Sequence, residues 1–281
     1  MAALDAWIEG GSRLTVRGRT LFVRQDGPAE GPPVTLVHGF PTSSHDWAGV
    51  VPLLAEAGLR VTTFDLLGFG HSDKPRGHAF SIEEQADLAQ GVWERLGIAE
   101  TALVAHDYGV SVAQELLARD QARIARMAWM NGGLYPDLHR PLLIQKLLHG
   151  RLGPLLARVT TQARLTSSMR KILGRPVPDA VLADMWASVA HDNGQLLAPR
   201  LLKYIDDRRR NASRWTASLE GYPGPTLFVW GPADPISGAH VLERIRERLP
   251  EAAIEELPGV GHYPQVEAPA ETGRALAGFL R

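Results

Sequence analysis

The 281-residue chain contains no cysteine, which excludes disulfide bonds, thiolate zinc sites and a cysteine nucleophile. It also lacks an apolar run of about 18 residues or more, so we expect no transmembrane helix. Neither sign of charge is in excess, with 30 Lys and Arg against 31 Asp and Glu. This balance gives no reason to expect a nucleic acid as a partner.

The beginning of the chain, MAALDAWIEGGSR, lacks a basic segment followed by an apolar one. It carries Asp5 and Glu9 instead, which is unlike a secretory signal. We therefore expect a cytoplasmic protein.

The hydrophobic residues that are present, 44% of the chain, follow strand patterns. Alternation of apolar and polar residues around Arg17-Gly18 predicts a β-hairpin over 12–26. Unbroken apolar runs are typical of strands buried on both faces, as in a parallel sheet. Such runs occur at 33–39, 61–66, 101–106, 126–131, 225–231 and 252–257.

Helical patterns lie between these runs, at 47–58, 110–119 and 268–280. A further helix begins at Ser81, where Glu84 three residues later predicts a capping box. Alternating strands and helices predict an α/β fold with a mostly parallel central sheet flanked by helices.

The alternation stops between 134 and 222, where the pattern is helical and leucine-rich. This segment holds 14 Lys and Arg against 7 Asp and Glu, a net charge of +7. We predict that 134–222 is a helical cap inserted into a core formed by 1–133 and 223–281.

The segment TALVAHDYGVSVAQELL contains the first candidate for chemistry, Asp107. A strand ends at His106 and a helix follows at once, with the small residues Ala105 and Gly109 on either side of Asp107. This pattern predicts a nucleophile elbow with Asp in place of Ser. The alternative is that Asp107 is an ordinary helix N-cap.

Two further polar residues follow predicted strands. Asp234 lies in LFVWGPADPISG, and His262 lies in LPGVGHYPQVEAP. The order nucleophile, acid, base is that of α/β hydrolases. We predict that Asp234 orients His262, which acts as the base. Asn131, at the end of another strand, cannot serve as the acid because it lacks a carboxylate.

The segment HGFPTSSHDW follows the strand ending at Val37. We expect the backbone N–H groups of Phe40 and Tyr108 to form an oxyanion hole, and His38 to contribute to the substrate site. An ordinary strand-to-helix loop is the alternative. The loop FDLLGFGHSDKP, with Gly68 and Gly70, is interpreted as the floor of the pocket.

A carboxylate nucleophile limits the reaction. Attack by Asp107 on an sp3 carbon gives an alkyl ester of the enzyme, which water must then hydrolyse. The substrate must therefore carry a leaving group on carbon, such as an epoxide oxygen or a halide. The sequence implies no metal and no organic cofactor.

Together, HGFPTSSHDW, DLLGFGHSDKP, AHDYG, WGPADP and GHYP resemble the α/β-hydrolase superfamily. The Asp elbow is similar to the branch that holds epoxide hydrolases and haloalkane dehalogenases. The segments 131–148, 184–197 and 262–269 resemble most closely the mesoderm-specific transcript family of that branch.

The resemblance implies roles for cap residues. Epoxide hydrolases use cap tyrosines to hydrogen-bond the epoxide oxygen, and Tyr204 and Tyr135 are the candidates here. Haloalkane dehalogenases hold halide with a Trp after the nucleophile and an Asn or second Trp. This chain has Tyr108 and Phe40 at those places, with Trp186 as a substitute. Epoxide hydrolysis to a diol is therefore the leading hypothesis, and haloalkane dehalogenation is the alternative.

Two other interpretations concern partners. The first is a non-catalytic α/β-hydrolase fold that binds a ligand. The presence of Asp107, Asp234 and His262 together argues against it, because a binding protein needs no catalytic triad. The segment 141–159 combines leucines with basic residues, which suits either a membrane surface or an apolar pocket lining. We favour the pocket lining and expect a small lipophilic substrate.

Overall fold

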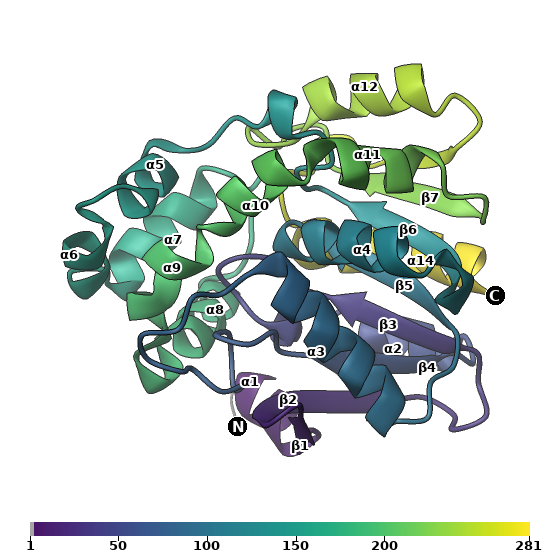
Figure 1. The fold of residues 1–281 in the computed structure, drawn as a ribbon, viewed down its shortest axis with the longest axis horizontal. Helices are drawn as coiled ribbons and strands as arrows, with labels where there is room; N and C mark the ends of the chain where they lie inside the picture. Colours follow the sequence, from purple (N-terminus) through teal and green to yellow (C-terminus); the bar gives the residue numbers. More distant parts are fainter. Residues whose placement is uncertain (1–2) are drawn as a thin grey trace.

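The computed structural model describes residues 3–281, and in them helices cover both faces of an eight-stranded sheet (Figure 1). The strand order is β1-β2-β4-β3-β5-β6-β7-β8. β2 runs antiparallel to β1 and β4, and the remaining neighbours are parallel. The strands are β1 (Ser12–Val16), β2 (Arg19–Asp26), β3 (Pro33–Val37), β4 (Arg60–Phe64), β5 (Thr101–His106), β6 (Ile124–Met130), β7 (Thr226–Trp230) and β8 (Ala253–Glu256).

This sheet confirms the predicted hairpin and the six predicted apolar strands. Every residue of β5 is buried, because helices pack on both of its faces. In the register with β6, His106 pairs with Met130. The carboxyl ends of the parallel strands therefore meet at one edge of the sheet.

Two layers of helices cover the sheet. One apolar cluster joins it to α3 (Ile82–Arg95), α4 (Tyr108–Arg119), α11 (Ala212–Glu220) and α12 (Ala239–Arg248). A second cluster joins the other face to α2 (Val51–Glu56) and α14 (Pro269–Leu280). The helix predicted at 47–58 is shorter than expected, because η1 (Ser44–Trp47) is a separate 3-10 turn. The remaining core helices are α1 (Ala3–Glu9) and α13 (Pro264–Glu267).

The predicted capping box of α3 forms only in half. The Ser81 hydroxyl accepts a hydrogen bond from the Glu84 N–H at 3.1 Å, as an N-cap should. The Glu84 carboxylate contacts His78 instead, 2.7 Å from its Nε2. The side chain of His78 thus replaces the backbone partner that the box requires.

The segment 134–222 is helical, and none of its residues belongs to a strand. Most of it lies beyond the carboxyl edge of the sheet (Figure 1). Its elements are η3 (Pro136–Leu138), α5 (Leu143–His149), α6 (Gly153–Arg158), α7 (Gln162–Arg170), α8 (Asp179–Ala190), η4 (His191–Leu197), α9 (Ala198–Leu201), α10 (Tyr204–Arg210) and α11.

Helix α11 packs on α4 rather than on the other helices of this segment. The Trp215 indole donates to the Glu115 carboxylate at 2.7 Å, and Arg214 forms an ion pair with the same group. We propose that the boundary between cap and core falls between α10 and α11, and we use the word cap for the helices from η3 to α10.

Across residues 3–281, no helix has the length and apolar character that a membrane crossing requires.

Candidate active site

Asp107 occupies a sharp turn between β5 and α4. Its φ is 46° and its ψ is −107°, a strained conformation for a residue with a side chain. Gly109 permits the turn, because a Cβ there would lie 2.6 Å from the Val37 carbonyl oxygen. An ordinary N-cap has extended backbone and a side chain bonded to the helix, and Asp107 has neither. The interpretation of Asp107 as a plain N-cap is therefore wrong.

The fold brings Asp107, Asp234 and His262 together from the ends of three parallel strands. Nδ1 of His262 lies 2.7 Å from Oδ2 of Asp234, within hydrogen-bond distance. Nε2 of His262 lies 3.7 Å from Oδ1 of Asp107, at ion-pair distance. All three residues are buried, with exposed fractions of 9%, 3% and 2% in that order.

The charges in this cluster support one another. Burial acts to lower the pKa of His262, but Asp234 and Asp107 on either side raise it to about 10. Burial acts to raise the pKa of Asp107, but the His262 and His106 rings and the Phe40 N–H lower it to about 2. The free site therefore holds an imidazolium between two carboxylates.

Asp234 is fixed by hydrogen bonds besides the one to His262. Its carboxylate accepts from the Ile236 N–H at 2.7 Å, the Ser237 hydroxyl at 2.6 Å and the Asn131 amide at 3.1 Å. Asn131 also bonds both backbone groups of Gly231. Asn131, which cannot be the acid, thus holds in place the turn after β7 that carries Asp234.

The Phe40 N–H donates to Oδ2 of Asp107 at 2.9 Å. The Phe40 carbonyl accepts a hydrogen bond from the Tyr263 hydroxyl at 3.0 Å, which fixes the loop from the other side. Tyr108 is the first residue of α4, so its N–H has no partner within the helix. The Phe40 N–H thus contacts the Asp107 carboxylate, and the Tyr108 N–H remains the predicted second donor.

The expectation that His38 lines the substrate site does not match the structure. His38 is fully buried. Its Nε2 accepts from the Leu66 N–H at 3.0 Å, and its Nδ1 lies 2.8 Å from the Gly39 carbonyl oxygen. Burial lowers the pKa of His38. With both nitrogens used by backbone, this ring joins two loops.

Two residues that the sequence did not single out position the backbone of His262. Nε2 of His106 lies 2.7 Å from the His262 carbonyl oxygen, and the Gln265 amide contacts Nδ1 of His106 at 3.0 Å. Burial and the neighbouring His262 charge lower the pKa of His106 to about 4. A neutral His106 therefore donates to His262 and accepts from Gln265.

Glu267 connects the His262 loop to the cap. Its Oε2 accepts from the N–H groups of Gly174, Arg175 and Gly261 at 2.7, 2.8 and 2.9 Å. Its Oε1 accepts from the Tyr263 N–H at 2.9 Å. A carboxylate that satisfies four backbone donors is a strong anchor. Its place in HYPQVEAP, at the end of α13, was the available signal.

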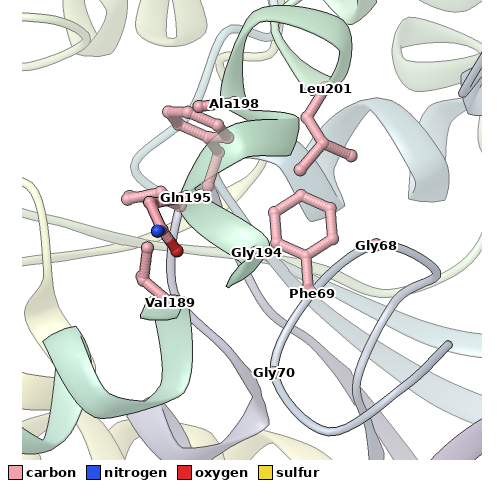
Figure 2. Close-up of a pocket in the computed structure, with 10 residues that line it drawn as sticks. Gly68, Phe69, Gly70, Val189, Gly194, Gln195, Ala198 and Leu201 are labelled. Carbon is pink, nitrogen blue, oxygen red and sulfur yellow. The ribbon is translucent and has the colours of Figure 1, made fainter. Parts of the chain in front are cut away.

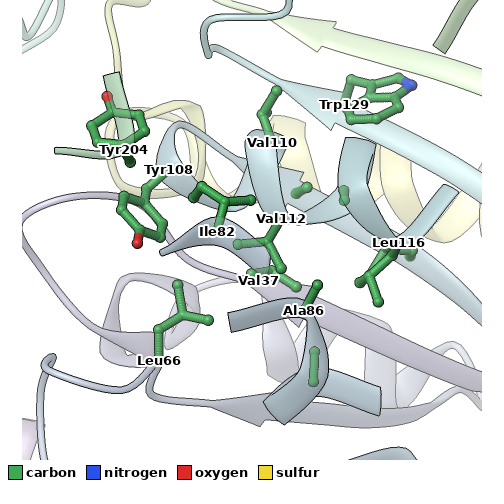
Figure 3. Close-up of a cluster of buried hydrophobic side chains, with 14 of the residues drawn as sticks. Val37, Leu66, Ile82, Ala86, Tyr108, Val110, Val112, Leu116, Trp129 and Tyr204 are labelled. Carbon is green, nitrogen blue, oxygen red and sulfur yellow. The ribbon is translucent and has the colours of Figure 1, made fainter. Parts of the chain in front are cut away.

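The three aromatic cap candidates lie in different surroundings. Tyr204 is buried against Tyr108, with ring centroids 4.7 Å apart (Figure 3). Burial and the charge of Asp107 raise the pKa of Tyr204. Tyr135 lies instead against Arg244, whose guanidinium is 5.5 Å from its ring, and near Glu220. Trp186 is half-buried on α8.

Only Tyr204 of these three therefore packs on Tyr108, the residue that follows Asp107 in the chain. The Tyr135 hydroxyl faces α11 and α12, which cover the sheet. The buried side chains of α8 are Leu182, Met185, Ser188 and Val189, and half-buried Trp186 lies at the edge of the face that they form.

A small, partly open cavity adjoins Phe40 between core and cap (Figure 2). Its volume is about 20 Å³, room for about one water molecule. Gly68, Phe69 and Gly70 border it, as expected for the pocket floor, and Val189, Ala198 and Leu201 come from the cap. A substrate therefore needs the cap to move. Within residues 3–281, no group of three or more His, Asp or Glu side chains is arranged to hold a metal ion.

Comparison with known proteins agrees with this geometry. A model of the alpha/beta hydrolase fold matches residues 32–269. The mesoderm-specific transcript homolog protein of Bos taurus is 38% identical over 99% of this chain and 88% of that protein. A haloalkane dehalogenase of Mycolicibacterium paratuberculosis is 30% identical over 81% of this chain and 76% of that protein.

Among solved structures, haloalkane dehalogenase DbeA from Bradyrhizobium elkani shares the fold, with a TM-score of 0.83 at 24% identity. The alignment covers 96% of this chain and 97% of that chain. The resemblance expected from the sequence motifs is confirmed. The chain belongs to the α/β-hydrolase fold family and is a hydrolase of that fold.

Proposed function

We propose that this hydrolase opens an epoxide to a diol through an alkyl ester on Asp107. The carrying observation is that the two carboxylate oxygens of Asp107 have different partners. Oδ2 accepts the Phe40 N–H, and Oδ1 faces His262. This arrangement leaves Oδ1 as the nucleophile and keeps Oδ2 in place for the second step.

In the first step, Oδ1 of Asp107 forms a bond to an epoxide carbon as the ring C–O bond breaks. The ring oxygen takes the electron pair and needs a proton. Tyr204 is the candidate donor, because it is buried against Tyr108, the residue after Asp107, and its raised pKa keeps the phenol protonated.

Ester formation prepares the second step. Once Asp107 is alkylated it has no charge, so one of the two carboxylates that raise the pKa of His262 is lost. The imidazolium then releases its proton more readily, and this proton restores the phenol of Tyr204 that was deprotonated in the first step. Neutral His262 accepts a proton from water as the water oxygen attacks the ester carbonyl carbon, and Asp234 stabilises the imidazolium that forms. The N–H groups of Phe40 and Tyr108 stabilise Oδ2 in the tetrahedral intermediate.

Haloalkane dehalogenation is the second candidate. The 30% identical relative that carries this name favours it. The same Asp107 ester would form, with halide leaving instead of an alkoxide. Trp186, the expected second halide donor, is only half-buried at the edge of the buried face of α8, which disfavours this reaction. A ligand-binding role without catalysis would not explain why Asp107, Asp234 and His262 converge.

The test is a single-turnover trap with the His262→Gln variant, which keeps the nucleophile and removes the base. The variant is incubated with a panel of epoxides and haloalkanes and weighed by intact-protein and peptide mass spectrometry. We expect an adduct on Asp107 with the mass of the whole epoxide. An adduct equal to a haloalkane minus its halide would assign the second candidate.

The matched control is the double variant Asp107→Asn/His262→Gln, which should give no adduct. Adduct on another residue, or wild-type turnover that survives Asp107→Asn, would contradict the proposal.

A further inference from the structure

The large apolar side chains that are exposed gather on two cap helices. Six of them lie between residues 143 and 159, with exposed fractions from 37% to 72%. These six are Leu143, Ile144, Leu147, Leu152, Leu155 and Val159, and we call them the cap patch. The expectation that the leucines of this segment line the pocket is therefore wrong for the cap patch, which faces outward.

The cap patch is surrounded by charge of one sign. Residues 138–178 contain eight Lys and Arg and no Asp or Glu. Arg140, Lys146, Arg151 and Arg158 are exposed, and none of them forms an ion pair with another residue of the described 3–281. Asp206 pairs with His149 and Lys203 here, and these four cations keep their charge unpaired within the described residues.

The helices of the cap patch are firmly attached by their inner faces. Leu148 and Ala157 are buried. His149 lies 3.0 Å from the Asp206 carboxylate, and Lys203 donates to the His149 carbonyl at 3.1 Å. The inner faces of α5 and α6 are thus occupied, so the cap patch is not left over from poor packing. Both helices lie at the edge of the molecule farthest from the sheet (Figure 1).

We propose that the cap patch and its basic residues dock on the surface of an anionic lipid bilayer. Aliphatic side chains flanked by Lys and Arg are the composition of interfacial helices, whose apolar face enters the headgroup region while the charges meet anionic lipid. The inference rests on exposure and charge and is independent of the chemistry at Asp107.

Two features of the chain favour lipid over protein. A second copy would bring two basic surfaces together without an acidic residue from 138–178 to pair with them. Protein interfaces are enriched in Tyr, Trp and Phe, and residues 136–185 contain none of these.

Docking would also act close to the substrate cavity. Helix α9 carries Ala198 and Leu201, which line the cavity, and it packs against α5 and α6. The surface that meets the bilayer is therefore attached to the part of the cap that closes over the site.

The test is co-sedimentation of the full chain with phosphatidylcholine vesicles and with vesicles that contain about 30% phosphatidylglycerol. We expect binding at least tenfold tighter to the anionic vesicles, weakening as salt is raised. Lys146→Gln/Arg151→Gln should weaken binding by roughly 25-fold, at about fivefold per charge. Leu152→Asp/Leu155→Asp should abolish it.

Matched controls come from other surfaces. Arg95 and Arg274 are exposed, form no ion pair within the described residues, and lie on α3 and α14. Arg95→Gln/Arg274→Gln and Leu196→Asp, which changes an exposed leucine outside the cap patch, should bind vesicles like wild type. Thermal unfolding verifies that each variant is folded.

Three results would overturn the proposal. The first is no binding to either vesicle, and the second is equal loss in the control and cap-patch variants. The third is a dimer, seen by sedimentation velocity, that disappears in Leu152→Asp/Leu155→Asp, since it would assign the cap patch to a second copy.

Discussion

The His262 ring lies closer to Asp234 than to Asp107, at 2.7 Å against 3.7 Å. The short contact fixes the tautomer and orientation of the ring. The long contact carries charge but no tight hydrogen bond, so the Asp107 oxygen that faces the ring is free to attack carbon. The asymmetry suits a site in which Asp107 changes covalently while Asp234 does not.

The charges of this cluster predict a pH-dependent stability. The pKa of His262 is about 10 in the folded state against 6.5 ordinarily, so its contribution is full below pH 6.5 and is lost as pH rises through 10. The pKa of Asp107 is about 2 against 3.8, so its contribution is full above pH 3.8 and is lost as pH falls through 2.

Wild type should therefore exceed His262→Gln in free energy of unfolding most between pH 3.8 and 6.5. The difference should shrink toward pH 10. Urea unfolding of both proteins across this range measures it. A difference that stays constant from pH 5 to pH 10 would refute the charged state assigned to His262.

Replacement of Asp234 by Asn should separate the two chemical steps. The amide can donate to Nδ1 of His262, which places the ring proton on Nε2 and prevents it from accepting one from water. Hydrolysis of the ester should fall by roughly 10⁴-fold, while attack by Asp107 continues. Rapid-quench mass spectrometry should therefore find the Asp107 adduct accumulating.

Ser237→Ala is the milder companion, because it removes only one of the hydrogen bonds to Asp234. Its hydrolytic step should lose about tenfold. Equal losses in formation and hydrolysis of the ester in Asp234→Asn would contradict the assigned role.

The two cap tyrosines provide a matched pair for the proton donor. Tyr204→Phe should slow epoxide opening by at least about 10²-fold, because the ring oxygen loses its acid. Tyr135→Phe should leave turnover unchanged, since that ring lies against Arg244. Stopped-flow measurement of ester formation tests both. Equal effects of the two changes, or none, would remove Tyr204 from the reaction.

Much of this site could be predicted because local sequence determines it. Apolar runs fix the parallel strands, and a polar residue directly after such a run must lie at the carboxyl edge. That rule places Asp107 directly, and it places Asp234 and His262 in the turns that follow β7 and β8 at the same edge. Glycine is required at position 109 because α4 approaches the Val37 backbone too closely for a Cβ.

The rest depends on contacts between residues far apart in the chain. Whether His38 faces a substrate or a backbone N–H depends on where Leu66 lies. Tyr135 and Tyr204 look alike as cap tyrosines, and only the path of the cap separates them. The amphipathic pattern of 141–159 could not tell an inward apolar face from an outward one, because both have the same period.

Glu267 shows what such a distant contact contributes, and its replacement by Gln should be costly. The amide keeps the shape but offers one acceptor oxygen to four backbone donors from the cap and the His262 loop. We expect a loss of roughly 2–4 kcal/mol in the free energy of unfolding. Because His262 acts after the substrate binds, the change should lower kcat and leave KM nearly unchanged.

The control is Glu271→Gln, which breaks a half-exposed ion pair with Arg175 and should cost under about 1 kcal/mol of unfolding free energy. Similar losses in both variants, or a fall in stability without a fall in kcat, would mean that Glu267 holds the cap but does not position His262.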